Sequence, residues 1–130
     1  METQGFKQLV AWQKGYQLSL DIYKATGTFP STETYGLASQ MRRAAVSIPA
    51  NIAEGYNRQY RKEYLQFLSI ASGSLAELET YLLLARDLGY LQRDRFNPLD
   101  DVRKDVGRVL SGLIKSLRRT LAPRPLTPDP

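Results

Sequence analysis

Apolar residues between positions 61 and 88 recur at alternating spacings of four and three, the heptad pattern of helices that pack side by side. The residues of this seam are Tyr64, Leu68, Ala71, Leu75, Leu78, Leu82 and Ala85. A helix with such a seam must bury it against other helices, so the pattern favours a helical bundle. We expect this helix to end at Gly89, because glycine readily adopts the left-handed conformation of a C-terminal cap.

Two helical patterns precede this segment, and no part of the chain has the alternation of a β-strand. The first spans about residues 9–26, and the second spans about residues 32–56 with Ser31 or Thr32 as its cap. Short connections between long helices favour antiparallel neighbours. Together with the helix described next, these segments predict an all-α fold, an antiparallel up-down four-helix bundle.

A fourth helix is predicted to begin at "NPLDDV", where Asn97 caps it and Pro98 takes the first helical position. We expect one bundle domain over residues 1–121. Residues 122–130 contain four prolines in nine residues, which prevents the helix from continuing. This tail is predicted to be extended or disordered.

Some helices carry more apolar surface than one bundle can bury. Residues 9–26 have two seams on nearly opposite faces, one made by Leu9, Trp12, Tyr16, Leu20 and Tyr23, the other by Ala11, Gly15, Leu18, Ile22 and Ala25. The helix at 61–88 has a weaker second stripe of Ile70, Ser74, Tyr81, Leu84 and Leu88. The surplus predicts a homo-oligomer, and we expect Leu18 and Ile22 to be candidates for its interface.

The stretch "SIPANIAEG" places Pro49 inside the predicted helix at 32–56. Proline has no N–H, so the Ala45 carbonyl loses its partner, and a mid-helix proline costs about 3 kcal/mol. We expect a kink, with the freed carbonyl met by water, a side chain or a neighbouring chain. Ser47 and Asn51 can supply polar groups there, and Glu54 can pair with an arginine. The kink is either a bend within the bundle or the shape of an oligomer pore or contact surface.

Two stretches, "RRAAVSIPANIAEG" (42–55) and "QFLSIASGSLAELET" (66–80), resemble the bacterial four-helix bundle family found in intervening sequences of large-subunit ribosomal RNA genes. Members of that family were once labelled ribosomal proteins. The resemblance covers about residues 6–91. It marks a family motif comprising Ser47, Pro49, Asn51, Glu54 and Gly55.

The resemblance implies a ring-shaped oligomer, with a pentamer as the expected form. It also implies similarity to the accessory variability proteins of diversity-generating retroelements, basic rings that bind nucleic acid and a reverse transcriptase. The chain departs from the family where a capping serine is usual, near Tyr60. Here Asn57 or no side chain is expected to cap the third helix.

The net charge of +5 is concentrated in two patches. In "YNRQYRKEY", tyrosines alternate with Arg58, Arg61 and Lys62, and such a surface can neutralise phosphates and stack on bases. On the fourth helix, one face carries Lys104, Arg108, Lys115, Arg118 and Arg119. This face can track a nucleic-acid backbone. The alternative is that both patches are ordinary solvated helix faces.

The composition argues against catalysis. The chain has no cysteine and no histidine, which excludes thiolate metal sites, di-iron bundle sites and histidine bases. Its glycines form no phosphate-binding loop. We therefore expect no enzyme activity, no cofactor and no metal. The sequence has neither a secretory signal nor a run of about 18 apolar residues, so a cytoplasmic protein away from the membrane is expected.

Two hypotheses of function follow from these patterns. The first is a non-catalytic, oligomeric bundle that binds RNA or DNA through its basic patches. The second is a structural or adaptor protein, whose ring presents a surface to another protein.

Overall fold

A computed structural model describes residues 5–121 of the chain. Four helices make up the fold: α1 (Val10–Thr26), α2 (Leu37–Tyr56), α3 (Arg61–Asp87) and α4 (Arg93–Leu121). Two short 3-10 turns, η1 (Gly5–Gln8) and η2 (Ser31–Glu33), precede α1 and α2, and the described residues contain no strand. The predicted all-α four-helix bundle is confirmed. The proline-rich tail lies outside the described residues.

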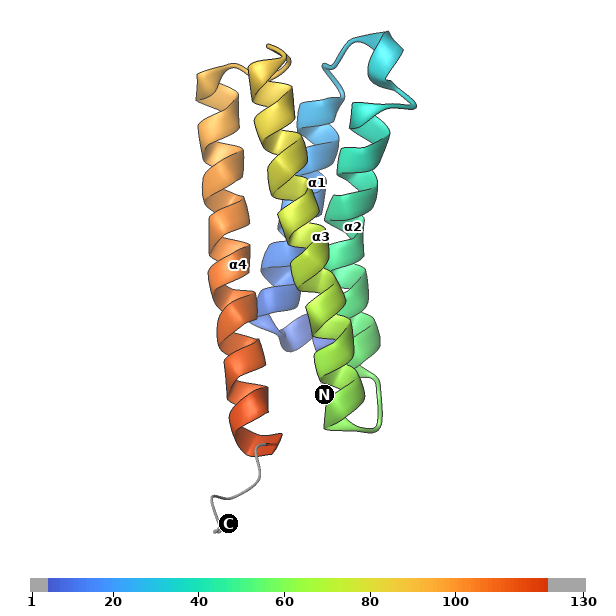
Figure 1. The fold of residues 1–130 in the computed structure, drawn as a ribbon, viewed down its shortest axis with the longest axis vertical. Coiled ribbons are helices and arrows are strands. Elements are labelled where there is room, and N and C mark those ends of the chain that lie inside the picture. The colour runs from blue at the N-terminus through green and yellow to red at the C-terminus, as the bar shows by residue number, and fades with distance from the viewer. Residues whose placement is uncertain (1–4, 122–130) are drawn as a thin grey trace.

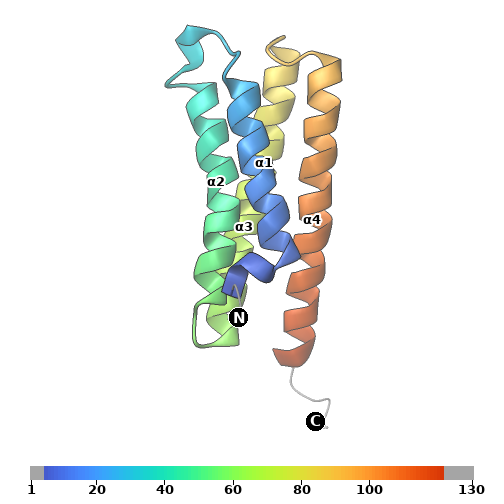
Figure 2. The same ribbon diagram turned by 180° about the vertical axis from the view of Figure 1, so that it is seen from behind.

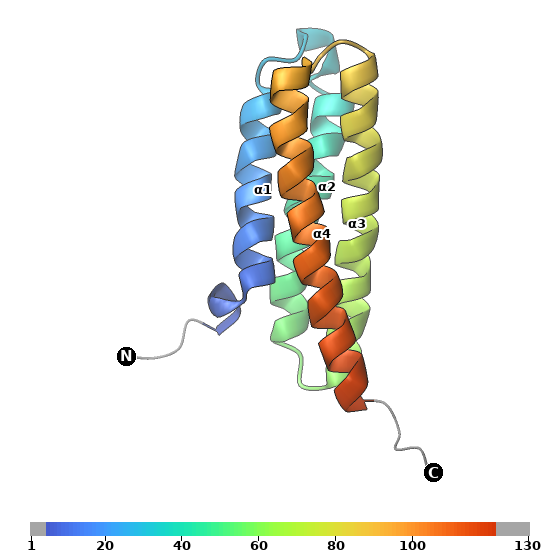
Figure 3. The same cartoon turned by 90° about the vertical axis from the view of Figure 1, so that its left-hand side faces the viewer.

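The four helices stand at the corners of a square. In Figure 1 the chain runs up α1, down α2, up α3 and down α4. Each helix packs against its two neighbours in this cyclic order, so that α1 and α3 occupy one diagonal and α2 and α4 the other. Figure 3 shows the same arrangement from the side of α4. The η1 turn lies against α1 and α2, as Figure 2 shows.

The predicted heptad seam of α3 forms the centre of the core. Its members Leu68, Ala71, Leu75, Leu78, Leu82 and Ala85 are buried, and Tyr64 packs against them. Gly89 follows α3 with φ of 82°, and the N–H groups of Gly89 and Tyr90 bond the carbonyls of Arg86 and Ala85. This is a Schellman cap, so the predicted role of Gly89 is confirmed.

The predicted start of the second helix was wrong. Residues 31–33 form the η2 turn instead, and α2 begins only at Leu37. The Oε1 atom of Glu33 accepts the N–H of Leu37 at 2.9 Å, so this side chain caps α2 from the preceding turn. The Tyr90 hydroxyl donates to Oε2 of Glu33 at 2.8 Å. That bond ties together the two turns at this end of the bundle.

The predicted start of the fourth helix was also wrong. Asn97 does not cap α4, which begins at Arg93 and contains Pro98 within its second turn. The Gln92 carbonyl accepts the N–H groups of Arg95 and Phe96 and so starts the helix. Phe96 is 6% exposed, and burying its ring stabilises a turn that local capping signals do not mark.

The seam of α1 that was predicted to lie in the interface faces the core, and the other seam faces outward. The seam with Leu18 and Ile22 is fully buried in the core, so these residues are not available to a neighbouring subunit. The other seam faces outward at Tyr16, Leu20 and Tyr23, which are 41–49% exposed. The sequence showed two seams but gave no sign of which faced the core, because both have helical spacing.

The second apolar stripe of α3 is partly buried and partly exposed. Ser74 is buried and Tyr81 packs against the core, whereas the stripe is exposed at Ile70, Leu84 and Leu88. By length and composition α3 is the one described helix able to cross a membrane, with a mean hydropathy of 1.2 over its most apolar window. The bundle core buries the apolar seam of this helix.

Candidate nucleic-acid interface

The two predicted basic patches meet at one end of the bundle. Arg58, Arg61 and Lys62 lie at the turn between α2 and α3, and the last turns of α4 reach the same end (Figure 1). Nη1 of Arg61 donates a hydrogen bond to Oγ1 of Thr120, a contact between residues 59 positions apart. We call this surface the basic end, and it comprises Arg58, Arg61, Lys62, Lys115, Arg118 and Arg119.

Most cations of the basic end have no acidic partner. Arg58 is the exception: its Nη2 pairs with Oε2 of Glu54 at 2.7 Å, and its guanidinium lies 4.7 Å from the centre of the Phe67 ring. Within residues 5–121, no carboxylate lies in ion-pair distance of the other five: Arg61, Lys62, Lys115, Arg118 and Arg119. These five charges remain open to an anionic partner.

The other half of the predicted stripe on α4 is neutralised. Lys104 lies 3.6 Å from Asp100, and Arg108 pairs with Asp105. Asp105 also accepts from Lys14 of α1 at 2.6 Å, and the bonds from Lys14 and Arg108 lower the pKa of this carboxyl group below its ordinary value. The cations of the stripe that have no acidic partner among the described residues therefore lie toward the C-terminal end of α4.

Two hollows lie along the basic end. One, of about 190 Å³, is lined by Arg58, Arg61, Tyr60 and Tyr64, together with Gln59 and Leu117. Tyr60 is 61% exposed and so is free to stack, whereas the Tyr64 ring packs on the core and its hydroxyl oxygen is buried without a hydrogen-bond partner. Burial raises the pKa of Tyr64, with a smaller contribution from Tyr56. Tyr64 belongs to the heptad seam, as predicted, and is not free to stack on a base.

The second hollow, of about 270 Å³, lies between α3 and α4. Lys115 and Arg118 line it with three serines, Ser69, Ser72 and Ser111. Hydroxyl groups beside unpaired cations can donate hydrogen bonds to phosphate oxygens. The basic end thus combines unpaired cations and hydroxyl groups with two exposed tyrosines, Tyr60 and, at 41% exposure, Tyr56.

The motif residues of α2 join helices within the chain. Pro49 is buried, and α2 continues through it. The Ala45 carbonyl that Pro49 frees accepts a hydrogen bond from Ser19 Oγ of α1 at 3.0 Å. At this crossing, a Cβ on Gly15 would lie only 3.3 Å from Ile48 Cγ2 and 3.6 Å from the Pro49 ring. The bend at Pro49 stays a prediction.

Ser47 and Asn51 do not satisfy the freed carbonyl, contrary to expectation. Asn51 Nδ2 donates to the Ser47 carbonyl at 2.8 Å and lies 2.9 Å from Ser47 Oγ. The Ser47 hydroxyl is 2.8 Å from the hydroxyl of Ser74 on α3. These residues instead form a polar link between α2 and α3.

Glu54 and Gly55 complete the motif. Glu54 pairs with an arginine as predicted, and that arginine is Arg58. Gly55 is buried, and a Cβ at this position would lie 2.8 Å from Phe67 Cβ and 3.0 Å from Tyr64 Cδ1. The close approach of α3 therefore requires glycine here. Tyr60 precedes α3 without a side-chain cap, one of the two outcomes expected there.

No sequence pattern indicated that Thr120 would join the two patches. A threonine in the last turn of a helix carries no pattern of its own, and its contact with Arg61 depends on how α4 packs beside α3. The sequence likewise placed Ser74 in an apolar stripe, although its hydroxyl proved to be part of the polar link to α2.

Comparisons with known proteins identify relatives. A family model described as 23S rRNA-intervening sequence protein matches residues 7–112. A crystal structure of a protein of unknown function from the S23 ribosomal protein family of Bacteroides thetaiotaomicron has 25% sequence identity and a TM-score of 0.74. That match covers 82% of this chain and 99% of the other. None of the curated proteins matches.

Proposed function

Because this chain belongs to the 23S rRNA-intervening sequence protein family, we propose that it is a non-catalytic, oligomeric helical protein that binds nucleic acid through its basic end. The hydrogen bond between Arg61 and Thr120 carries the proposal, since it unites two cationic patches that are distant in the sequence. A contiguous group of unpaired cations attracts phosphates more strongly than scattered surface charges do.

The basic end favours backbone contacts over base recognition. Its cations and serines suit phosphate oxygens, which carry no sequence information. Tyr60 adds one exposed ring, on which an unpaired base can stack without regard to sequence. The protein is therefore expected to bind single-stranded RNA or DNA with a strong dependence on salt and a weak dependence on sequence.

The assembly we propose is a ring formed by copies of this chain. Exposed apolar side chains lie on α1, at Tyr16, Leu20 and Tyr23, and on α3, at Ile70, Leu84 and Leu88. Because α1 and α3 occupy diagonal corners, these two faces point away from each other. Contact between two different faces repeats head to tail and produces a ring when the rotation closes. The resemblance stated above makes a pentamer the expected ring.

Nucleic-acid binding is tested by fluorescence anisotropy with labelled single-stranded RNA and duplex DNA at several salt concentrations. Wild-type protein should bind, with affinity falling steeply as salt rises. The double variant Lys115→Glu/Arg118→Glu should lose binding while its circular dichroism stays helical. Lys24→Glu/Lys104→Glu is the matched control, because it changes the net charge equally but lies away from the basic end.

Two results would contradict the proposal. If both double variants weaken binding equally, net charge alone is responsible and the basic end is not a site. If wild-type protein binds neither RNA nor DNA near physiological salt, the result favours the adaptor function instead. One feature favours that second function: a hollow of about 550 Å³ lined by Tyr23, Arg42 and Val46. Tyr35, which also lines this hollow, is 95% exposed.

A further inference from the structure

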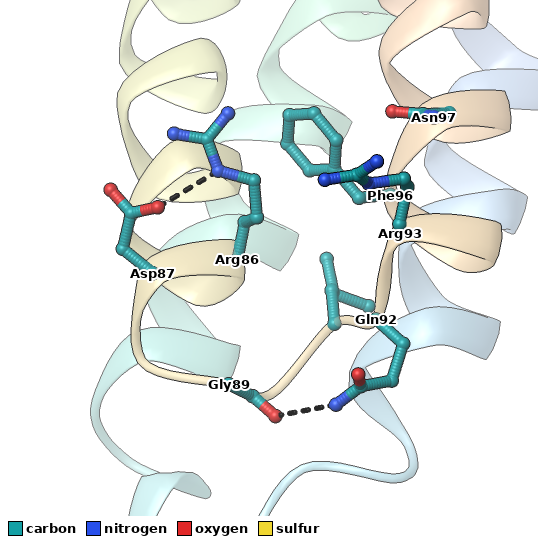
Figure 4. A pocket seen from close by; sticks show the side chains of 8 residues that line it. Arg86, Asp87, Gly89, Gln92, Arg93, Phe96 and Asn97 are labelled. Atoms are coloured by element: carbon teal, nitrogen blue, oxygen red, sulfur yellow. Dashed lines mark hydrogen bonds and ion pairs between the residues drawn. The ribbon is translucent and has the colours of Figure 1, made fainter.

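Another hollow, which is lined by two arginines, lies at the end of the bundle opposite the basic end. It is formed where α3 ends and α4 begins, and its volume is about 510 Å³ (Figure 4). Arg86 enters it from the last turn of α3, and Arg93 enters it from the first turn of α4. This volume lies within the usual range for small-molecule sites.

The two guanidinium groups retain unused donors. Arg86 bonds Asp87 only through Nε, at 2.8 Å, and its guanidinium carbon lies 5.1 Å from the centre of the Phe96 ring. Figure 4 shows Asp87 on the side of Arg86 that faces away from Phe96. Arg93 has no ion pair among the described residues. The Nη atoms of Arg86 and the whole Arg93 guanidinium are therefore available to a ligand.

The hollow has a rigid base. Leu91 is 2% exposed and Phe96 is 6% exposed, so both are anchored in the core. The Schellman cap at Gly89 and the two bonds to the Gln92 carbonyl fix the backbone between α3 and α4. Because this backbone is held before any ligand arrives, the ordering cost of binding falls on the side chains alone.

We propose that this hollow binds the oxyanion of a small molecule, a carboxylate or a phosphate, between Arg86 and Arg93. Planar guanidinium groups match both oxyanions with paired N–H donors. The side chains of Gln92 and Asn97 also line the hollow and offer amide donors. Two arginines and Asp87 leave the lining with one net positive charge, which attracts either oxyanion.

This site is separate from the basic end and does not depend on nucleic-acid binding. The test follows the Nε–H signals of ¹⁵N-labelled arginine side chains by NMR during titration with sodium phosphate or sodium acetate at constant ionic strength. The signals of Arg86 and Arg93 should move and saturate together. The probe that binds more tightly identifies the chemical group that the hollow prefers.

Arg93→Gln should weaken binding of the preferred probe about tenfold, the effect of losing one charge-assisted hydrogen bond. Arg95→Gln is the matched control, because Arg95 lies in the same turn but bonds Thr28 outside the hollow. Shifts that grow linearly without saturation, or equal weakening by both variants, would overturn the proposal. So would a larger loss of RNA affinity in Arg93→Gln than in Arg95→Gln, because the hollow would then belong to the nucleic-acid surface.

Discussion

The Ser19 hydroxyl on α1 donates to the Ala45 carbonyl on α2 at 3.0 Å, and it shares its one proton with the Gly15 carbonyl of its own helix at 3.1 Å. This is the carbonyl that Pro49 deprives of its backbone partner. Ser19 is only 7% exposed, so water has little access to replace the bond. A proline in one helix is thus accommodated by a serine in its neighbour, and the pair fixes how α1 and α2 pack.

Ser19→Ala should lower the free energy of unfolding by about 1–3 kcal/mol, since it leaves a buried carbonyl without a partner. In a Pro49→Ala background the N–H at position 49 returns to Ala45, so the serine should matter much less. Urea denaturation of the two single variants and the double variant measures this coupling. Equal costs in both backgrounds would show that Ser19 stabilises the fold by some other contact.

Gly55→Ala should destabilise the protein by about 1–3 kcal/mol, because the new Cβ would overlap Phe67 and the helices must separate. Gly73→Ala provides the control. It lies within α3 with no atom within 4 Å of the added Cβ, so it should stabilise by up to about 1 kcal/mol through helix propensity. Thermal unfolding followed by circular dichroism compares them, and similar melting temperatures would contradict the predicted clash.

Glu33 links stability to pH. Its hydrogen bonds from the Leu37 N–H and the Tyr90 hydroxyl hold its pKa below the ordinary value of 4.5. The ionised carboxylate therefore stabilises the fold above about pH 4.5, and this contribution disappears as pH falls through the lowered pKa. Glu33→Gln should be less stable than wild type at neutral pH, with the difference shrinking in acid.

Urea denaturation at a series of pH values measures that difference. Glu77→Gln is a suitable control, because Glu77 is exposed and makes no side-chain hydrogen bond among the described residues. A destabilisation of Glu33→Gln that stays constant with pH would mean that the carboxylate charge has no part in the cap.

Leu20→Asp should break the proposed ring while leaving the bundle folded, because Leu20 is 41% exposed on the outer face of α1. Native mass spectrometry reports the subunit count, and circular dichroism reports the fold. Val10→Asp, at an apolar position on another face of α1 that is 52% exposed, should leave the mass unchanged. An unchanged mass for Leu20→Asp would remove the outer face of α1 from the interface.

Arg118→Gln should reduce the salt dependence of RNA binding. Each phosphate contact on a single strand contributes a slope of about −0.7 to log K against log salt concentration, so removing one contact should lessen the slope by about that amount. Arg108→Gln should change the slope less, because Arg108 already pairs with Asp105. Anisotropy titrations measure both slopes, and equal changes would show that the two arginines contribute alike.

The sequence pattern predicted a helix correctly where the pattern was repeated over many turns. The seven-residue seam of α3 and its end at Gly89 were predicted correctly, because a long heptad pattern and a glycine cap leave few alternatives. The starts of α2 and α4 were predicted wrongly. At α2 the Glu33 side chain, three residues before the N-cap Gly36, accepts the Leu37 N–H, which common capping motifs do not describe. At α4 the Gln92 carbonyl accepts the ordinary first helical bond from Phe96, but glutamine is not a residue type that marks an N-cap in a sequence.

The sequence by itself determined the helical class, the four segments and the position of the most buried seam, because periodicity is a local property of the chain. Only the tertiary structure decided which seam of α1 faces inward and which partner meets the Ala45 carbonyl. It also decided that Asp100 and Asp105 neutralise half of the α4 stripe, while Arg61 and Thr120 join the other half to the turn before α3. These outcomes depend on distances between helices, which no single helix encodes.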